Sequence, residues 1–142
     1  MTTIISALKA YLLTYPELTD GASLNVDFVG PDMKGYNIAP LPGEKVLESY
    51  IDGGSMRAYP FSFQSVESTA DELARMEANG FYEDFSAWLE AQTLAETLPV
   101  LTGGKTATAV EASGWGYLYQ QEASSNGMYQ IQCRLVYEQD KL

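Results

Sequence analysis

The chain has 142 residues, of which 46% are hydrophobic and 19% charged, a balance typical of a globular protein. At this length we expect one domain spanning residues 1–142, with a core of its own. Nineteen acidic residues, eight basic residues and no histidine give a formal net charge of −11, which disfavours tight binding to nucleic acid or to an anionic membrane.

Two further features bear on the cellular compartment. Cys133 is the one cysteine, so an internal disulfide is excluded. The apolar start of the chain has no basic segment before it and is too short to span a bilayer, so we expect neither a signal peptide nor an anchor. The protein is therefore expected to be made, and to mature, in a cytoplasm.

The first third of the sequence predicts a helix, a strand and a loop. Thr2 or Thr3 can cap a helix in which apolar residues recur at helical spacing, and Pro16 marks its end. Alternation from residue 24 to 28 indicates a strand with one buried face. The range 30–43 is rich in proline and glycine, so it is predicted to be mostly loop, with a short strand at 36–39.

Residues 45–51 and 56–66 form the clearest hairpin. Both ranges are rich in strand-forming residues, and Asp52-Gly53-Gly54 between them permits the positive φ of a tight turn. Pro60 has no N–H to donate, so we expect this part of the second strand to lie at an edge or a bulge.

Two helices and then two strands are predicted next. Thr69 and Glu72 fit a capping box that opens a short helix, and Asn79-Gly80 fits its end. A second helix is expected from about 81 to 94. The ranges 109–119 and 128–137 are predicted to be strands, joined by a polar loop over 120–127.

This order of elements predicts an α+β fold. We expect one mixed or antiparallel sheet of four to five strands, with the N-terminal helix and the two middle helices packed on one face. Strand pairing beyond the two hairpins does not follow from the sequence.

The residue types disfavour an enzyme. Without histidine the chain has no Ser-His-Asp or Cys-His system and no imidazole ligand, so we expect no catalytic residue, no metal and no cofactor. Cys133 alternates with Ile131 and Leu135, which predicts a small core residue. Gly103-Gly104-Lys105-Thr106 resembles the end of a phosphate-binding loop, but Pro99 stands where the motif needs glycine, so a polar turn is predicted.

Carboxylates are concentrated between residues 67 and 96. A solvated helix face is the simplest interpretation. The functional interpretation is an acidic surface, either for a basic partner or around a channel that DNA must pass without sticking. On that interpretation the candidate lumen residues are Glu83, Glu90 and Glu96.

Tyrosine and methionine are frequent, and several of them lie beside predicted turns, which favours an interface slightly over a role in strand formation alone. Loops at the ends of hairpins are suitable contacts because a rigid sheet positions them. The candidate interface residues are therefore Asp52, Gly53, Gly54, Ser124, Ser125 and Asn126.

Short segments spread over nearly the whole chain carry a family resemblance, although each is weak alone. In order they are Leu24-Asn25-Val26-Asp27, Tyr50-Ile51-Asp52-Gly53, Gly80-Phe81-Tyr82-Glu83-Asp84-Phe85 with Trp88-Leu89-Glu90, Leu98-Pro99-Val100-Leu101, Gly116-Tyr117-Leu118-Tyr119 and Tyr129-Gln130-Ile131-Gln132-Cys133-Arg134-Leu135. Together they resemble the minor capsid proteins encoded in the head-tail gene block of long-tailed phages and prophages of Gram-positive bacteria. Within that block the chain is similar to the tail terminators.

The resemblance implies an α+β protein that assembles with itself as a hexameric ring on the end of the tail tube. Its implied partners are the tail-tube protein and head-completion or connector proteins, and its implied location is the virion, after assembly in the host cytoplasm. No catalytic residues follow from it. Two alternatives stay open: an acidic inhibitor that imitates DNA and blocks a nucleic-acid-binding enzyme, and a small enzyme using only carboxylates and hydroxyls, which the missing histidine disfavours.

Overall fold

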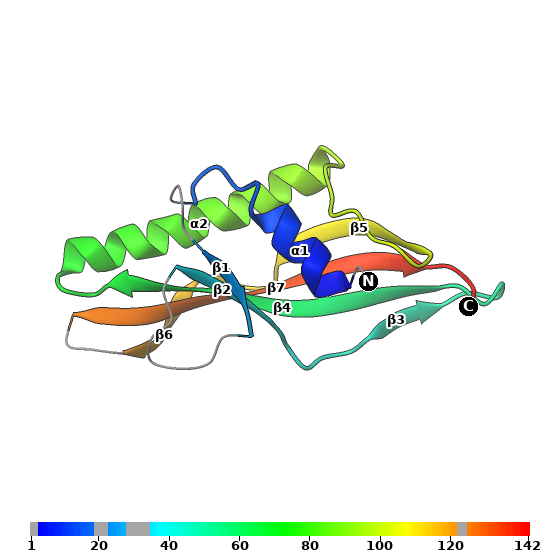
Figure 1. Ribbon diagram of the computed structural model, residues 1–142, viewed down its shortest axis with the longest axis horizontal. Coiled ribbons are helices and arrows are strands. Elements are labelled where there is room, and N and C mark those ends of the chain that lie inside the picture. Colours follow the sequence, from blue (N-terminus) through cyan, green and yellow to red (C-terminus); the bar gives the residue numbers. More distant parts are fainter. Residues whose placement is uncertain (1–2, 19–22, 28–34, 122–124) are drawn as a thin grey trace.

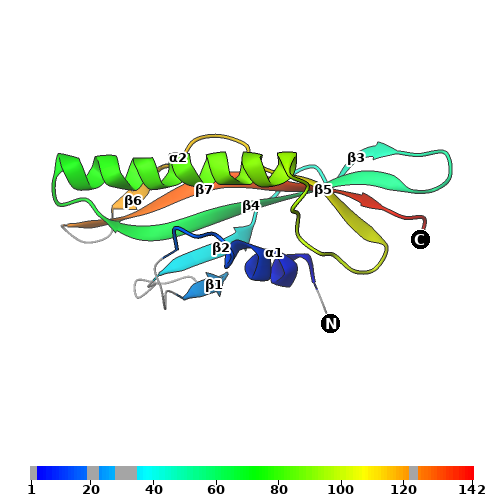
Figure 2. The ribbon, with the colours of Figure 1, turned by 90° about the horizontal axis from the view of Figure 1, so that it is seen from above.

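The computed structural model describes residues 3–18, 23–27, 35–121 and 125–142. Over these residues the fold is α+β, with two helices and a seven-stranded mixed sheet (Figure 1). The predicted architecture of four to five strands and three helices is wrong, because the sheet is larger and the two middle helices are one. Both helices contribute to one core on the same face of the sheet (Figure 2).

Helix α1, Ile4–Leu12, begins as the sequence indicates. Thr3 is the N-cap: its hydroxyl accepts a hydrogen bond from the amide of Ser6, and the Ser6 hydroxyl accepts one from the amide of Thr3. Leu8 and Leu12 are fully buried, so the apolar stripe of the helix faces the sheet.

The first four strands include the predicted hairpin. β1 (Leu24–Val26) and β2 (Tyr36–Pro40) pair in parallel, which makes the sheet mixed. β3 (Val46–Ser49) and β4 (Ser55–Ser68) pair in antiparallel around the turn at Asp52–Gly54. The parts of the predicted strand and loop at 28–34 lie outside the described residues.

β4 is a central strand, but at Pro60 one of its sides has no strand neighbour, as the expected local edge requires. β2 pairs with β4 from Phe61 onward, and β3 pairs with it up to Arg57, so Pro60 lies in the gap between these two neighbours. Its carbonyl accepts a hydrogen bond from the amide of Leu41. The missing N–H of Pro60 therefore removes no ladder bond.

Helix α2, Glu72–Leu94, is continuous where the sequence predicts two helices, and its N-cap is Asp71, not Thr69. Gly80 lies inside it, and no atom is within 4 Å of the place that a Cβ would take. Packing on both sides of Gly80 keeps the helix intact, since tertiary contacts outweigh local propensity. The buried residues of α2 are Ala78, Tyr82, Phe85 and Leu89.

The predicted strand at 109–119 is two strands, β5 (Lys105–Ala112) and β6 (Tyr117–Gln121). Both pair with β7 (Asn126–Gln139), so the predicted loop at 120–127 is shorter than expected. Gly116 separates them. A Cβ at Gly116 would overlap the Cβ and Cγ of Tyr82 in α2, so this connection requires glycine.

β4 and β7 form the centre of the sheet, paired from Ser55 with Gln139 to Ser68 with Asn126. β2 and β3 flank this pair on one side, and β5 and β6 flank it on the other. β3 lies beside the start of β4 and β6 beside the start of β7. Because β4 and β7 are antiparallel, β3 and β6 flank opposite sides of this pair at its two opposite ends, and Figure 1 shows them at opposite ends of the sheet.

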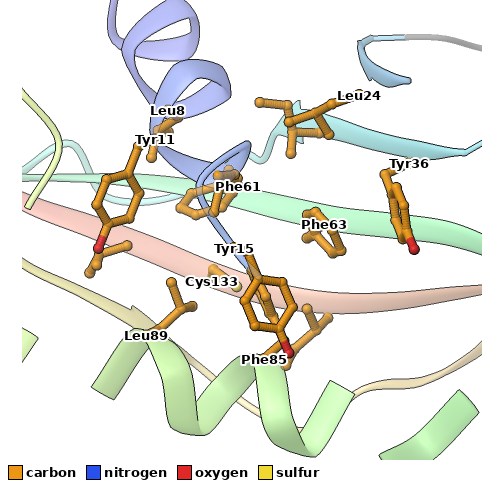
Figure 3. Close-up of a cluster of buried hydrophobic side chains, with 14 of the residues drawn as sticks. Leu8, Tyr11, Tyr15, Leu24, Tyr36, Phe61, Phe63, Phe85, Leu89 and Cys133 are labelled. Carbon is orange, nitrogen blue, oxygen red and sulfur yellow. The ribbon is translucent and has the colours of Figure 1, made fainter. Parts of the chain in front are cut away.

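An aromatic-rich core lies between the helices and the sheet (Figure 3). The ring centroids of Phe63 and Phe85 are 4.5 Å apart in a stacked pair, and those of Tyr15 and Trp88 are 4.9 Å apart. Most of the buried tyrosines belong to this core, so their number reflects packing more than an interface. The alternating residues of β7 are buried as predicted, namely Tyr129, Ile131, Cys133, Leu135 and Tyr137.

Candidate functional site: two free strand edges and a cationic hollow

β6 is an edge strand whose five residues are all exposed. Among the described residues it pairs with β7 alone, so its other side presents backbone groups that a further strand could use. Large side chains gather here: Trp115 is 72% exposed and Tyr119 53%. Exposed aromatic residues beside a free edge are typical of a surface that binds another chain.

A chain of side-chain hydrogen bonds fixes β6 to the rest of the sheet. The amide of Asn37 donates to Gln64 at 2.8 Å, Gln64 donates to Gln130 at 2.6 Å, and Gln130 donates to the hydroxyl of Tyr117 at 2.8 Å. These residues belong to β2, β4, β7 and β6. They alternate with Phe63 and Ile131 and therefore lie on the face opposite the helices. Such a network holds the edge rigidly.

β3 is a second free edge. Its four residues are exposed, and in the described part of the chain it pairs with β4 alone. Val46 and Leu47 are each 37% exposed, and Ile51 in the following turn is fully exposed. β3 and β6 share one irregularity: each contains one extra residue relative to its partner, between Val46 and Glu48 in one strand and after Leu118 in the other.

The edge of β5, by contrast, is occupied. The hydroxyl of Thr93 in α2 bonds both the carbonyl and the amide of Val110, which is fully buried. Helix α2 therefore closes β5 to an added strand.

A hollow of about 540 Å³ lies on the helix side of the sheet beside the start of α1, and we refer to it as the cationic hollow. Lys45, Arg57 and Lys105 line it together with apolar and aromatic side chains, and no carboxylate side chain does. None of the three makes an ion pair with a described residue; the ion pair of the described chain joins Arg134 and Glu111. The hollow is thus a local cationic site on an acidic protein.

The predicted lumen residues lie on or just beyond α2. Glu83 and Glu90 are exposed and seven residues apart, so they share one helix face, directed to solvent. Glu96 follows the end of α2 and is exposed, with a left-handed φ of 58°. The structure thus places Glu83 and Glu90 in one row and Glu96 apart from it.

The predicted interface turns lie beside the two free edges. Asp52, Gly53 and Gly54 follow β3, and the Asp52 carboxylate accepts from the amide of Gly54 at 2.8 Å. Ser125 and Asn126 are exposed where the chain passes from β6 to β7. Ser124 is outside the described residues.

The buried ionisable groups are packed in the core. Burial raises the pKa of the Cys133 thiol far above its usual range, which leaves it a neutral core residue. Burial also raises the pKa of Tyr82, whose hydroxyl shares a hydrogen bond with Ser65 at 2.6 Å and donates to the carbonyl of Tyr129 at 3.2 Å. Glu67, outside this core, is half-buried near the end of β4, and burial raises its pKa as well.

Over the described ranges, no group of three or more Cys, Asp or Glu side chains is placed to hold a metal ion. No helix within those ranges combines the length and apolar character needed to cross a bilayer. Gly103 and Gly104 have positive φ and lead into β5, as in the predicted polar turn, whereas a phosphate-binding loop would open a helix.

No protein-family model and no curated protein matches the chain. The resemblance to tail terminators therefore stays a prediction.

Neither the free edges nor the cationic hollow is predicted from the sequence. One signal for β6 exists, because residues 115–119 include four large side chains with no half-buried alternation. For the hollow there is no local signal. Lys45, Arg57 and Lys105 are far apart in the sequence and are brought together only by the sheet.

Proposed function

We propose that the protein is a phage virion component at the head-tail junction, a tail terminator that closes as a ring on the tail tube and docks to head-completion proteins. The family resemblance over nearly the whole chain supports this role. The observation that carries it is the pair of free edges at opposite corners of one sheet. A subunit with two different binding surfaces assembles head to tail and can close into a ring, which we propose to be hexameric.

The acidic helix agrees with this role. DNA must pass through a terminator ring, and carboxylates such as Glu83, Glu90 and Glu96 would repel its phosphates if α2 bordered the channel. On this proposal the protein is made in the host cytoplasm and ends in the virion.

Tail-tube polymerisation tests the function. Purified tail-tube protein should form tubes of defined length when this protein is present and longer, more variable tubes when it is absent, measured by electron microscopy. Equal length distributions with and without the protein would remove the terminator assignment, even if the protein were found in virions.

The same carboxylates support a second candidate, an acidic inhibitor that imitates DNA. Glu83 and Glu90 form a short row of negative charge on one helix face, as a mimic of a phosphate backbone requires. Changing Glu83, Glu90 and Glu96 to lysine separates the two candidates. If the protein is an inhibitor, this triple variant should lose binding to the target enzyme. If the protein is a terminator, the same variant should still limit tube length, but DNA should pass through the particle more slowly.

A further inference from the structure

We propose that adjacent copies join by antiparallel pairing of β6 of one copy with β3 of the next, so that the sheet continues from subunit to subunit. This inference rests on the self-assembly proposed above. It adds which strands meet, in which register, and which charges lie beside the junction.

Strand directions allow this pairing without turning a subunit over. β3 and β7 are both antiparallel to β4, and β6 is antiparallel to β7. Within one subunit β3 and β6 therefore run in opposite directions. When a second copy is placed beside the first with its helices on the same side, β6 of one copy meets β3 of the other as an antiparallel neighbour.

Hydrogen bonds at the two ends of β3 show which of its backbone groups face outward. The carbonyl of Lys45 accepts a bond from β4, and the amide of Tyr50 donates one across the hairpin turn, so both residues face inward. Because successive residues alternate, the backbone groups of Val46 and Ser49 face the free edge.

The same reasoning applies to β6. The amide of Ser113 donates to the carbonyl of Gln132, so the even-numbered residues of β7 face β5 and β6. The backbone groups of the odd-numbered Tyr129 therefore face away from β6. Leu118 is opposite Tyr129, so the backbone groups of Leu118 point away from β7, toward the free edge.

Placing Ser49 opposite Leu118 makes the two edges complementary. In this register Leu47 and Tyr119, the extra residue of each strand, lie near the middle of the junction. They are 37% and 53% exposed in the single chain. The pairing would bring the two side chains close together and cover part of their exposed apolar surface, which favours association.

Charge favours the same head-to-tail contact. Helix α2 starts directly after the end of β4 that lies near β6, and the cationic hollow lies near β3, on the helix side of the sheet. In a continued sheet the start of α2 in one copy faces the hollow of the next. The exposed residues at this start are Asp71, Glu72, Leu73, Arg75, Met76 and Glu77, so three carboxylates stand against one guanidinium, which donates to the carbonyl of Thr69 in its own chain. Acidic and apolar groups thus face cationic and apolar ones, whereas pairing of like edges would not bring them together.

Disulfide crosslinking tests the strands and the register. Cys133 is buried, so cysteines introduced by Ser49→Cys and Leu118→Cys are the reactive ones. A mixture of the two single variants should crosslink on mild oxidation, because opposed residues of antiparallel strands have Cα atoms about 4.5–5.5 Å apart, within disulfide range. Neither variant should crosslink alone. The control mixture is Val46→Cys with Leu118→Cys. Because Leu47 is an extra residue, Val46 and Ser49 are opposite β4 residues two positions apart, so this pair is offset by about 7 Å along the strand and should not react.

Each result decides between the inference and the proposed function. A crosslink in one variant alone would overturn the inference in favour of pairing between like edges. An uncrosslinked mixture, from chains that still set tube length, would overturn the strand pairing and leave the terminator role standing. A crosslinked mixture, from chains that do not limit tube growth, would support the pairing and remove the terminator role.

Charge exchange tests the contact at the hollow. Lys105→Glu in the Ser49→Cys chain should slow crosslinking, and so should Glu77→Lys in the Leu118→Cys chain. Combining the two should restore the rate, since the opposite charges are exchanged. Unchanged rates with each single reversal would overturn the contact between α2 and the hollow.

Discussion

The hydroxyl of Thr93 closes the edge of β5 by donating to the carbonyl of Val110 at 2.7 Å and accepting from its amide at 3.1 Å. One side chain of α2 thus satisfies the outward amide and carbonyl of Val110, near the middle of the edge that a further strand would use. The contact distinguishes β5 from β3 and β6, which have no such cover among the described residues.

Thr93→Val should lower stability and open the edge of β5. Valine keeps the shape of threonine but leaves the amide and carbonyl of Val110 unpaired in a buried place, at a cost of about 1–3 kcal/mol. Urea unfolding measures this cost, and light scattering measures association through the opened edge. Thr106→Val, at an exposed position of the same strand, is the control and should change neither.

Gly116→Ala should destabilise the protein. The added methyl group would overlap the Cβ and Cγ of Tyr82, so α2 or the β5–β6 connection must move, at a cost of about 1–3 kcal/mol. Gly114→Ala is the matched control, because no atom lies within 4 Å of its added Cβ. Equal melting temperatures for the two variants would contradict the close approach of this connection to α2.

Gly80→Ala should stabilise the protein. Gly80 lies in the interior of α2 with open space around its Cβ position, and replacing such a glycine by alanine gains about 0.5–1 kcal/mol. At this chain length, that corresponds to a rise in melting temperature of roughly 1–4 °C. A helix that ended at Gly80, as the sequence predicts, would instead lose stability, because alanine is unfavourable at a left-handed C-cap.

Glu67→Gln should stabilise the protein at neutral pH and not at low pH. Burial raises the pKa of Glu67 in the folded state above its unfolded value, so the folded chain binds the proton more tightly. Stability therefore falls as pH rises through the window between the two pKa values, and the penalty is absent below the unfolded value of about 4.3. Thermal melts at pH 7 and near pH 3 measure the difference. Glu77→Gln, at an exposed position, is the control.

Local patterns were sufficient for several elements. Three short-range predictions are confirmed by the structure: a helix cap at Thr2 or Thr3, found at Thr3, the turn at Asp52–Gly54, and the buried alternation around Cys133. Such features depend on residues within a few positions of each other, which is what a sequence window reports.

Long-range packing explains what the sequence did not predict. Asn79-Gly80 has the composition of a helix end, yet the apolar residues on either side of it share one buried stripe. The predicted strand at 109–119 is divided into β5 and β6, and the connection between them passes close to α2, where Gly116 lies against Tyr82, a residue distant in the sequence. The candidate site is subject to the same limit, since the turns were predicted as contacts but the free edges beside them depend on sheet order.

The position of β7 has a consequence for how the chain folds. β7 pairs with β4, β5 and β6, all of which precede it in the chain, so these three strands complete their pairing only after β7 has been synthesised. Phe61 and Phe63 stay without their neighbours in β7 until it arrives, and pairing over such sequence separations is slow because loop closure must come first. A chain truncated before β7 would therefore expose the edge and the apolar residues of β4 that β7 covers.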